Sequence, residues 1–217
     1  MTFDLFENQE LPPLGKEHLA PGAVLLRAFA YADAALILEQ MALISARSPF
    51  RHMTTPGGYD MSVAMTNCGN YGWVTDRRGY RYTDRDPITQ NCWPEMPNTF
   101  YQLAINAARE GGFDQFQPDV CLINRYAVGA KMSLHQDKDE TDFAQPIVSL
   151  SFGLPAIFQF GGMLRSDTLK KALLTHGDVV VWGGDSRLVY HGILPVKDGD
   201  HRLTGPYRIN MTFRQSG

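Results

Sequence analysis

Two residues of the stretch SLHQDKDE, His135 and Asp137, could bind a metal ion together. In a β-strand, residues i and i+2 point to the same side, so both side chains would leave a strand end in one direction. An imidazole and a carboxylate on one face are two of the three ligands of a facial metal triad. The third should be a histidine on another strand. Of the 6 histidines, only His191, in RLVYHGILPV, lies in an apolar strand-like run, so we choose it.

These three residues alone do not decide between a metal site and ordinary structure. The pattern His-x-Asp often arises by chance, and a buried histidine is commonly a hydrogen-bonded core residue.

The last strand-like run, YRINMTFRQ, alternates polar and apolar residues, which gives it one polar face. This face is either solvated or lines a pocket that binds a dianion, because guanidinium groups bind carboxylates through paired, charge-assisted hydrogen bonds. A second run, DVCLINRY, has an apolar face that becomes polar at Asn124 and Tyr126, as expected for a core that opens into a site. The polar face of the last run consists of Arg208, Asn210, Thr212 and Arg214.

The elements around these residues are mainly short strands. Apolar spacing predicts helices over residues 31–46 and 98–110, the second with Asn98 as its N-cap and an end at Gly111 and Gly112. From about residue 118, six β-rich runs separated by Gly, Pro and Asp turns predict an antiparallel sandwich or barrel. We therefore expect a mostly β protein with flanking helices.

Composition restricts the class of protein. A chain of 217 residues is long enough for one sizeable core, and a net charge of -3 argues against broad nucleic-acid coating, though not against a local basic patch. The 3 cysteines are widely spaced, so neither a disulfide framework nor a cysteine zinc site is expected. The chain has no long apolar run for a membrane and its first residues do not resemble a secretory signal. We expect a cytoplasmic monomer.

Several longer strings resemble one known family. TPGGY, MSVAMTNCG, FQPDVCLINRYA, LHQDKDE, GLPAIFQFGG and HGDVVVWGG are together similar to the AlkB family of iron- and 2-oxoglutarate-dependent dioxygenases, from about residue 20 to the C-terminus. The resemblance implies a double-stranded β-helix, or jelly-roll, core. It divides the single domain 1–217 into an N-terminal extension and helix (1–50), a nucleotide-recognition lid (51–97), a supporting helix (98–117) and the dioxygenase core (118–217).

The resemblance also implies ligands. Fe(II) would be held by His135, Asp137 and His191, with 2-oxoglutarate and O2 as co-substrates. Arg208, with Tyr126 and Asn210, would bind the distal carboxylate of 2-oxoglutarate. Arg214 and Asn124 would face the end that chelates iron.

The run NYGWVTDRRGYRYTDRD mixes aromatic residues and arginines, which suits base stacking and phosphate contact in single-stranded nucleic acid. The alternative is a solvated loop packed on the core. The resemblance favours the first reading. It places Trp73 against an extruded base opposite His135 and Asp139 near the positive charge of a lesion. The other implied substrate residues are Tyr80, Arg81 and Tyr82 near phosphate and Arg165 in the pocket wall.

The implied activity is oxidative demethylation of 1-methyladenine and 3-methylcytosine in single-stranded or damaged DNA, with RNA as a second candidate. One rival is a 2-oxoglutarate-dependent hydroxylase of a protein or small molecule, for which the aromatic and basic run would be irrelevant. Another is a jelly-roll binding module with a structural zinc or no metal.

Overall fold

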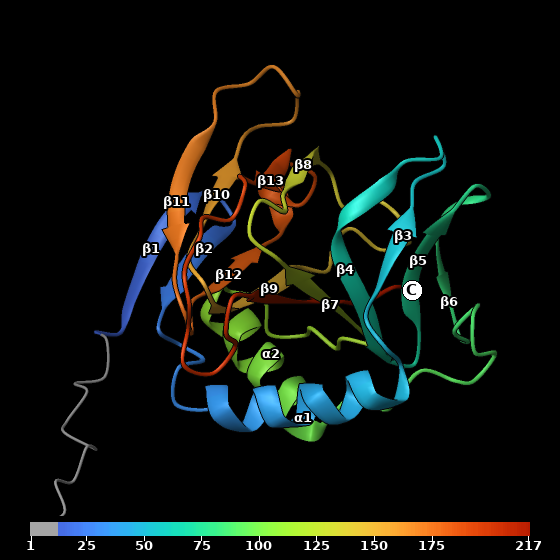
Figure 1. Cartoon of the computed structure of the whole chain (residues 1–217). Helices are drawn as coiled ribbons and strands as arrows, with labels where there is room; N and C mark the ends of the chain where they lie inside the picture. The colour runs from blue at the N-terminus through green and yellow to red at the C-terminus, as the bar shows by residue number, and fades with distance from the viewer. Residues whose placement is uncertain (1–12) are drawn as a thin grey trace, which may run out of the picture.

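The computed structural model describes residues 13–217, and its largest element is an antiparallel sheet. This sheet has eight strands in the order β1-β2-β12-β9-β14-β7-β4-β3 (Figure 1). The strands are β1 (Gly15–Ala20), β2 (Ala23–Arg27), β12 (Val179–Trp182), β9 (Ile147–Gly153), β14 (Arg208–Arg214), β7 (Val120–Tyr126), β4 (Asp60–Gly69) and β3 (Arg51–Thr54).

A second sheet of four strands, in the order β11-β10-β13-β8, packs against one face of the first. Its strands are β11 (Lys170–Leu174), β10 (Ala156–Phe160), β13 (His191–Ile193) and β8 (Met132–His135). Two further strands, β5 (Gly72–Asp76) and β6 (Gly79–Thr83), form a separate hairpin, and a short 3-10 helix, η1, spans Gly184–Ser186. Two facing antiparallel sheets confirm the expected jelly-roll core.

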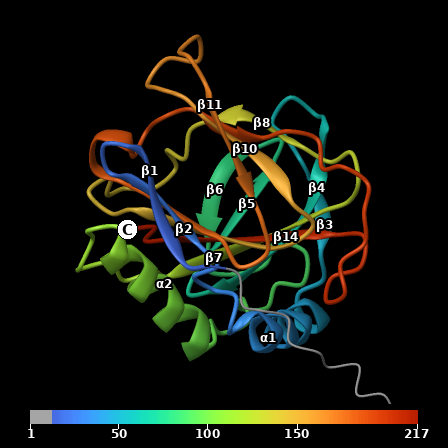
Figure 2. The same cartoon turned by 90° about the vertical axis from the view of Figure 1, so that its left-hand side faces the viewer.

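Two helices, α1 (Ala34–Arg47) and α2 (Asn98–Glu110), cover the other face of the larger sheet. Figure 2 shows both helices on one side of this sheet, away from β8, β10 and β11. The core between helices and sheet includes Ile37 and the edge-to-face pair of Phe100 and Phe213, whose ring centroids are 6.5 Å apart. Truncating either phenylalanine to alanine would cost about 3–5 kcal/mol, because both rings are fully buried.

Alternation along β14 sends its residues into two different cores. Ile209, Met211 and Phe213 face the helices, whereas Arg208 and its i+2 neighbours lie between the two sheets. All residues of β14 are buried, so its polar face is not a solvated outer surface. The polar residues of this strand therefore face an enclosed interior.

Helix α2 has the predicted bounds, but Asn98 does not cap it. The N-cap is Pro97, and Asn98 is the first helical residue, whose Oδ1 accepts a hydrogen bond from Gln102 Nε2 at 3.5 Å. Pro97 has an extended conformation (φ -58°, ψ 142°) and starts the helix without a side-chain cap. At the other end, a Cβ on Gly111 would lie 2.6 Å from Cγ1 of Val181, so glycine lets this helix end pack on the sheet.

The expected division of the chain needs correction in its first half. Strands β1 and β2 lie within residues 1–50 and belong to the larger sheet rather than to an extension, and β3 and β4, within 51–97, do so too. Short apolar runs such as AVLLR do not reveal their partners, because β-pairing joins segments far apart in sequence. The first twelve residues, where no secretory signal was expected, lie outside the described residues. No helix within residues 13–217 is long and apolar enough to cross a membrane.

Candidate metal and co-substrate site

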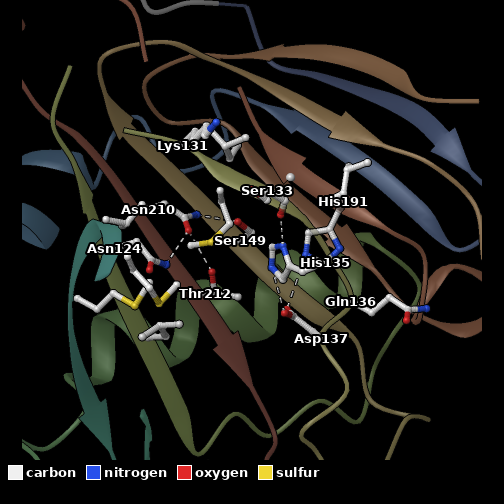
Figure 3. A pocket seen from close by; sticks show the side chains of 18 of the residues that line it. Asn124, Lys131, Ser133, His135, Gln136, Asp137, Ser149, His191, Asn210 and Thr212 are labelled. Carbon is white, nitrogen blue, oxygen red and sulfur yellow. Dashed lines mark hydrogen bonds and ion pairs between the residues drawn. The ribbon is translucent and has the colours of Figure 1, made fainter. Parts of the chain in front are cut away.

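The two expected histidine ligands are neighbours across one strand pair. His135 ends β8 and is the register partner of His191 on β13, which places their ring centroids 4.4 Å apart. Asp137 follows two residues after β8. Its Oδ1 lies 3.6 Å from Nε2 of His135 and its Oδ2 lies 3.9 Å from Nε2 of His191 (Figure 3). The candidate ligand atoms of the three residues all lie within 4.8 Å of one another.

Both imidazoles are oriented for metal binding through Nε2. Nδ1 of His135 lies 2.9 Å from the carbonyl oxygen of Ser133, and Nδ1 of His191 lies 3.1 Å from that of Val189. A carbonyl oxygen only accepts hydrogen bonds, so each Nδ1 carries the proton and each Nε2 presents a lone pair. Burial lowers the pKa of His191 to about 4, and the charge of His135 acts in the same direction. His191 is therefore neutral at pH 7, as a metal ligand must be.

Asp137 is kept ionised by a buried arginine. Arg214 donates to Asp137 Oδ2 from Nη2 at 2.7 Å and from Nε at 3.2 Å. Burial alone would raise the pKa of Asp137, but Arg214 and the two histidines hold it well below its usual range. Burial likewise opposes the charge on Arg214, yet the carboxylates beside it raise its pKa. The triad thus offers two imidazole nitrogens and one carboxylate, a donor set that fits Fe(II) with positions left open.

Two buried residues that the sequence did not single out hold the segment after Asp137. Arg187 donates from Nη1 to the carbonyl oxygen of Asp137 at 2.6 Å and from Nη2 to Glu140 Oε2 at 2.9 Å. The side chains of Arg187 and Glu140 are 3% and 2% exposed. Glu140 belongs to the charged run around Asp137, which was a local signal, but no sequence pattern links Arg187 to it.

At the other end of the interior, Arg208 is a fully buried guanidinium that has no carboxylate partner within residues 13–217. Its Nη2 donates to Ser151 Oγ at 3.1 Å, and its guanidinium carbon lies 4.8 Å from the ring centroid of Tyr126. Its Nε and Nη1 find no hydrogen-bond partner among the described residues. Burial lowers the pKa of Arg208, and Tyr126 opposes this shift. Because a guanidinium stays charged in proteins, this end of the site fits an anionic ligand such as the distal carboxylate of 2-oxoglutarate.

Asn210 lies between Arg208 and Arg214 along β14. It is the centre of a hydrogen-bond network with Asn124, Ser149 and Thr212 (Figure 3). Its Nδ2 donates to Ser149 Oγ at 2.8 Å and to the carbonyl oxygen of Leu150 at 2.9 Å. Its Oδ1 accepts from Asn124 Nδ2 at 3.1 Å and from Thr212 Oγ1 at 3.2 Å. Ser149 and Ser151 thus support the polar face, a role that the sequence did not indicate.

A cavity of about 610 Å³ joins the metal residues to four of the expected substrate residues, Trp73, Tyr80, Asp139 and Arg165. The rings of Trp73 and Tyr80 stack with centroids 5.6 Å apart, and Trp73 Nε1 donates to Asp139 Oδ2 at 2.8 Å. On the other side, Arg165 Nη2 donates to the carbonyl oxygen of Leu134 at 2.7 Å, and its guanidinium carbon lies 5.3 Å from the ring centroid of Tyr190.

The other two expected substrate residues, Arg81 and Tyr82, do not line this cavity. Alternation on β6 turns Arg81 away from Tyr80, and its Nη2 lies 2.8 Å from Asp76 Oδ2. Tyr82 points inward and donates its hydroxyl proton to Glu140. The resemblance places both near phosphate rather than in this cavity, and that contact stays a prediction.

Comparison with known proteins places this site in a family. A model of the 2OG-Fe(II) oxygenase superfamily matches residues 22–214. Alpha-ketoglutarate-dependent dioxygenase AlkB of Salmonella typhimurium is 59% identical over 213 residues, which cover 98% of this chain and 97% of the relative. Nucleic acid dioxygenase ALKBH1 of Mus musculus is 33% identical over 132 residues, 59% of this chain and 33% of the relative.

A solved structure agrees. The structure of OsALKBH1 has a TM-score of 0.82 at 30% identity and covers 93% of this chain and 100% of that chain. Fold, donor set and sequence thus lead to one family, and the binding-module alternative is excluded. The chain belongs to the AlkB dioxygenases of the 2OG-Fe(II) oxygenase superfamily, enzymes that use Fe(II), O2 and 2-oxoglutarate, also called alpha-ketoglutarate.

Proposed function

We propose that this dioxygenase demethylates 1-methyladenine and 3-methylcytosine in single-stranded or damaged DNA, with RNA as a second substrate. The observation that carries the proposal is the shared cavity: the stacked pair Trp73–Tyr80 and the Asp139 carboxylate line the same space as the metal residues. A relative whose name describes a nucleic acid dioxygenase supports it. We also propose that the enzyme acts as a cytoplasmic monomer, which light scattering can test for the oligomeric state.

The lining suits a base with an alkylated ring nitrogen. Such a base pairs poorly, so its extrusion from a duplex costs less than that of a normal base. It often carries a positive charge, which is attracted to aromatic faces and to a carboxylate. Trp73 and Tyr80 offer the aromatic faces, and Asp139 offers the carboxylate at the rim of the cavity.

The protein residues bind and orient the reactants. His135, Asp137 and His191 would hold the iron, and Arg208 would bind the distal carboxylate of 2-oxoglutarate. With O2, iron and 2-oxoglutarate supply the oxidation that hydroxylates the N-methyl carbon, after which formaldehyde leaves and succinate and CO2 remain. Arg214 keeps the Asp137 carboxylate ionised through hydrogen bonds from its Nε and Nη2. Trp73 and Tyr80 would hold the base so that its methyl group lies near the triad, where it can be oxidised.

Aerobic incubation with Fe(II), 2-oxoglutarate and a short strand containing 3-methylcytosine tests the proposal. We expect the strand to lose the mass of one methylene group and formaldehyde to appear in equal amount to the repaired base. A strand of the same sequence with unmodified cytosine is the control. If succinate forms but the methylated strand keeps its mass, the chain is instead a hydroxylase of a protein or small molecule.

A further inference from the structure

We propose that Asn67 is a positioning residue that fixes Trp73 over the cavity, an inference that rests on the proposed contact between Trp73 and the base. Asn67 lies on β4 and is fully buried. Its Nδ2 donates to the carbonyl oxygen of Trp73, and its Oδ1 accepts from the backbone N–H of Trp73, each at 3.0 Å. One side-chain amide thus satisfies both backbone groups of the residue that carries the indole.

The position of Trp73 in its hairpin explains why this clamp matters. Strand β5 has β6 as its one strand neighbour within the described residues. Trp73 is the register partner of Tyr82, yet its N–H and C=O are directed to Asn67 rather than across the hairpin. In an antiparallel pair, alternate residues direct both groups to the outer edge. Asn67 therefore takes the place that another strand would fill.

The clamp is connected to the cavity through the indole of Trp73. Trp73 Nε1 donates to Asp139, and the indole stacks on Tyr80 at an interplanar angle of 18°. Asn67 itself does not line the cavity. Its effect on a base must therefore pass through the backbone of Trp73, which makes Asn67 a positioning residue rather than a binding residue.

Few residue types could replace Asn67. A clamp on one peptide unit needs a donor and an acceptor on the same short side chain, which an amide supplies. Leucine has a similar shape but would leave the N–H and C=O of Trp73 without partners in a partly buried site. A lost partner there corresponds to about a 5- to 100-fold change in an equilibrium constant.

The test compares Asn67→Leu with Thr66→Val. Thr66 immediately precedes Asn67 on β4 and is fully buried. Its Oγ1 donates to the carbonyl oxygen of Ser48 at 2.6 Å, on the side of the strand away from the hairpin. Both changes remove side-chain hydrogen bonds of a fully buried residue and keep side-chain size, but only Asn67→Leu affects a bond to Trp73. Asn67→Ala, which removes the same bonds without steric conflict, is measured alongside.

For Asn67→Leu and Asn67→Ala we expect the KM for the 3-methylcytosine strand to rise about tenfold. Succinate formation without the strand should stay within about twofold, because the metal residues are not contacted. The Trp73 amide proton, which now bonds Oδ1, should exchange faster with solvent by NMR. Thr66→Val should show none of the three changes.

An unchanged KM beside faster Trp73 exchange would overturn the inference, as would an equal KM rise in Thr66→Val. Failure of the proposed function looks different. In that case the wild-type enzyme would not demethylate the strand at all, while the exchange of the Trp73 amide would still report whether the clamp holds.

Discussion

The two walls of the cavity are built in opposite ways. Arg208 and Asn210 project from β14, which has β9 and β7 as hydrogen-bonded neighbours on its two sides. Trp73 and Tyr80 project from a two-stranded hairpin that shares no strand ladder with the rest of the described chain. This hairpin is held instead by side chains, namely Asn67 at Trp73, Glu140 at Tyr82, and Trp93, whose Nε1 donates to the Thr83 carbonyl oxygen at 2.9 Å.

This difference matches the tasks of the two walls. Oxidation needs a metal and a co-substrate in fixed geometry, and a continuous sheet supplies it. Recognition of a base within a long polymer needs a wall that can yield while the strand enters. Elements with few ladder bonds open at lower free energy than core strands. We therefore expect variants in the sheet to affect all turnover, and variants in the hairpin to affect only turnover of the nucleic acid.

The largest effect is expected for His135→Ala and Asp137→Ala. Loss of a residue that supports a metal ligand costs about 10- to 100-fold in affinity or activity, so loss of a ligand should cost at least about 100-fold. The His135 side chain is 38% exposed, so its removal should lower Tm by only about 2–4 °C. Succinate formation and calorimetry measure the two quantities, with Lys138→Ala, an exposed neighbour, as control. Full activity in either variant would refute the metal assignment.

The second largest effect is expected for Arg208→Met, which should weaken 2-oxoglutarate binding without lowering the stability of the fold. Arg208→Met should raise the Kd for 2-oxoglutarate at least about 30-fold, because a buried charge pair would lose one partner. Without 2-oxoglutarate the variant should be as stable as the wild type or more stable, since an unpaired buried charge is replaced by an apolar side chain. Titration calorimetry and denaturant unfolding measure both.

Arg125→Met is the matched control for this prediction. Arg125 lies on β7 and its guanidinium carbon is 4.6 Å from the ring centroid of Phe50, on the helix side of the sheet. Arg125→Met should lower the stability of the fold and leave the Kd for 2-oxoglutarate unchanged. A strong loss of stability in Arg208→Met with an intact Kd would contradict the assigned role.

A moderate effect is expected for Trp73→Ala on the hairpin. Stacking on one base contributes about 1–3 kcal/mol, so binding of the methylated strand should weaken about tenfold. The Kd for 2-oxoglutarate should not change, because Arg208 and Asn210 are untouched. Fluorescence anisotropy of a labelled strand measures the first value. Equal losses for both ligands would mean that the two walls do not act separately.

The smallest effect is expected for Arg81→Ala. Its guanidinium is bound by Asp76 within the hairpin and lies outside the cavity. The KM for the methylated strand should change by less than about twofold, as for most surface substitutions. A loss as large as that of Trp73→Ala would support the phosphate contact that the resemblance implies for Arg81.

The same contrast explains what the sequence could predict. The polar face of β14 follows from i, i+2 alternation, which is local. Asp137 is close to His135 in sequence and was expected beside it, although it lies beyond the end of β8. His191 was chosen because its run reads as a strand, and register then brought it opposite His135. The helix bounds of 98–110 also follow from local spacing.

Other contacts between residues far apart in sequence were not predicted. Arg187 contacts Asp137 from 50 positions away, and β2 pairs with β12 from the far end of the chain. The clamp between Asn67 and Trp73 spans six residues but depends on how a turn folds back, which no periodicity reveals. For Arg81, composition identifies the chemistry of the run but not the direction of the side chain, which the structure turns toward Asp76.

One consequence concerns strand β8, which is an outer strand of the smaller sheet. It has four residues and, among the strands that the structure describes, pairs with β13 alone, with an irregularity between His191 and Ile193. A slip of one residue would turn His135 to the opposite side of the sheet. An ion bound by His135, Asp137 and His191 would link β8 to β13 and hold the register of β8. Removal of iron should therefore increase the mobility of β8 before that of any other strand. The bound metal would then support both the reaction and the position of an outer strand of the smaller sheet.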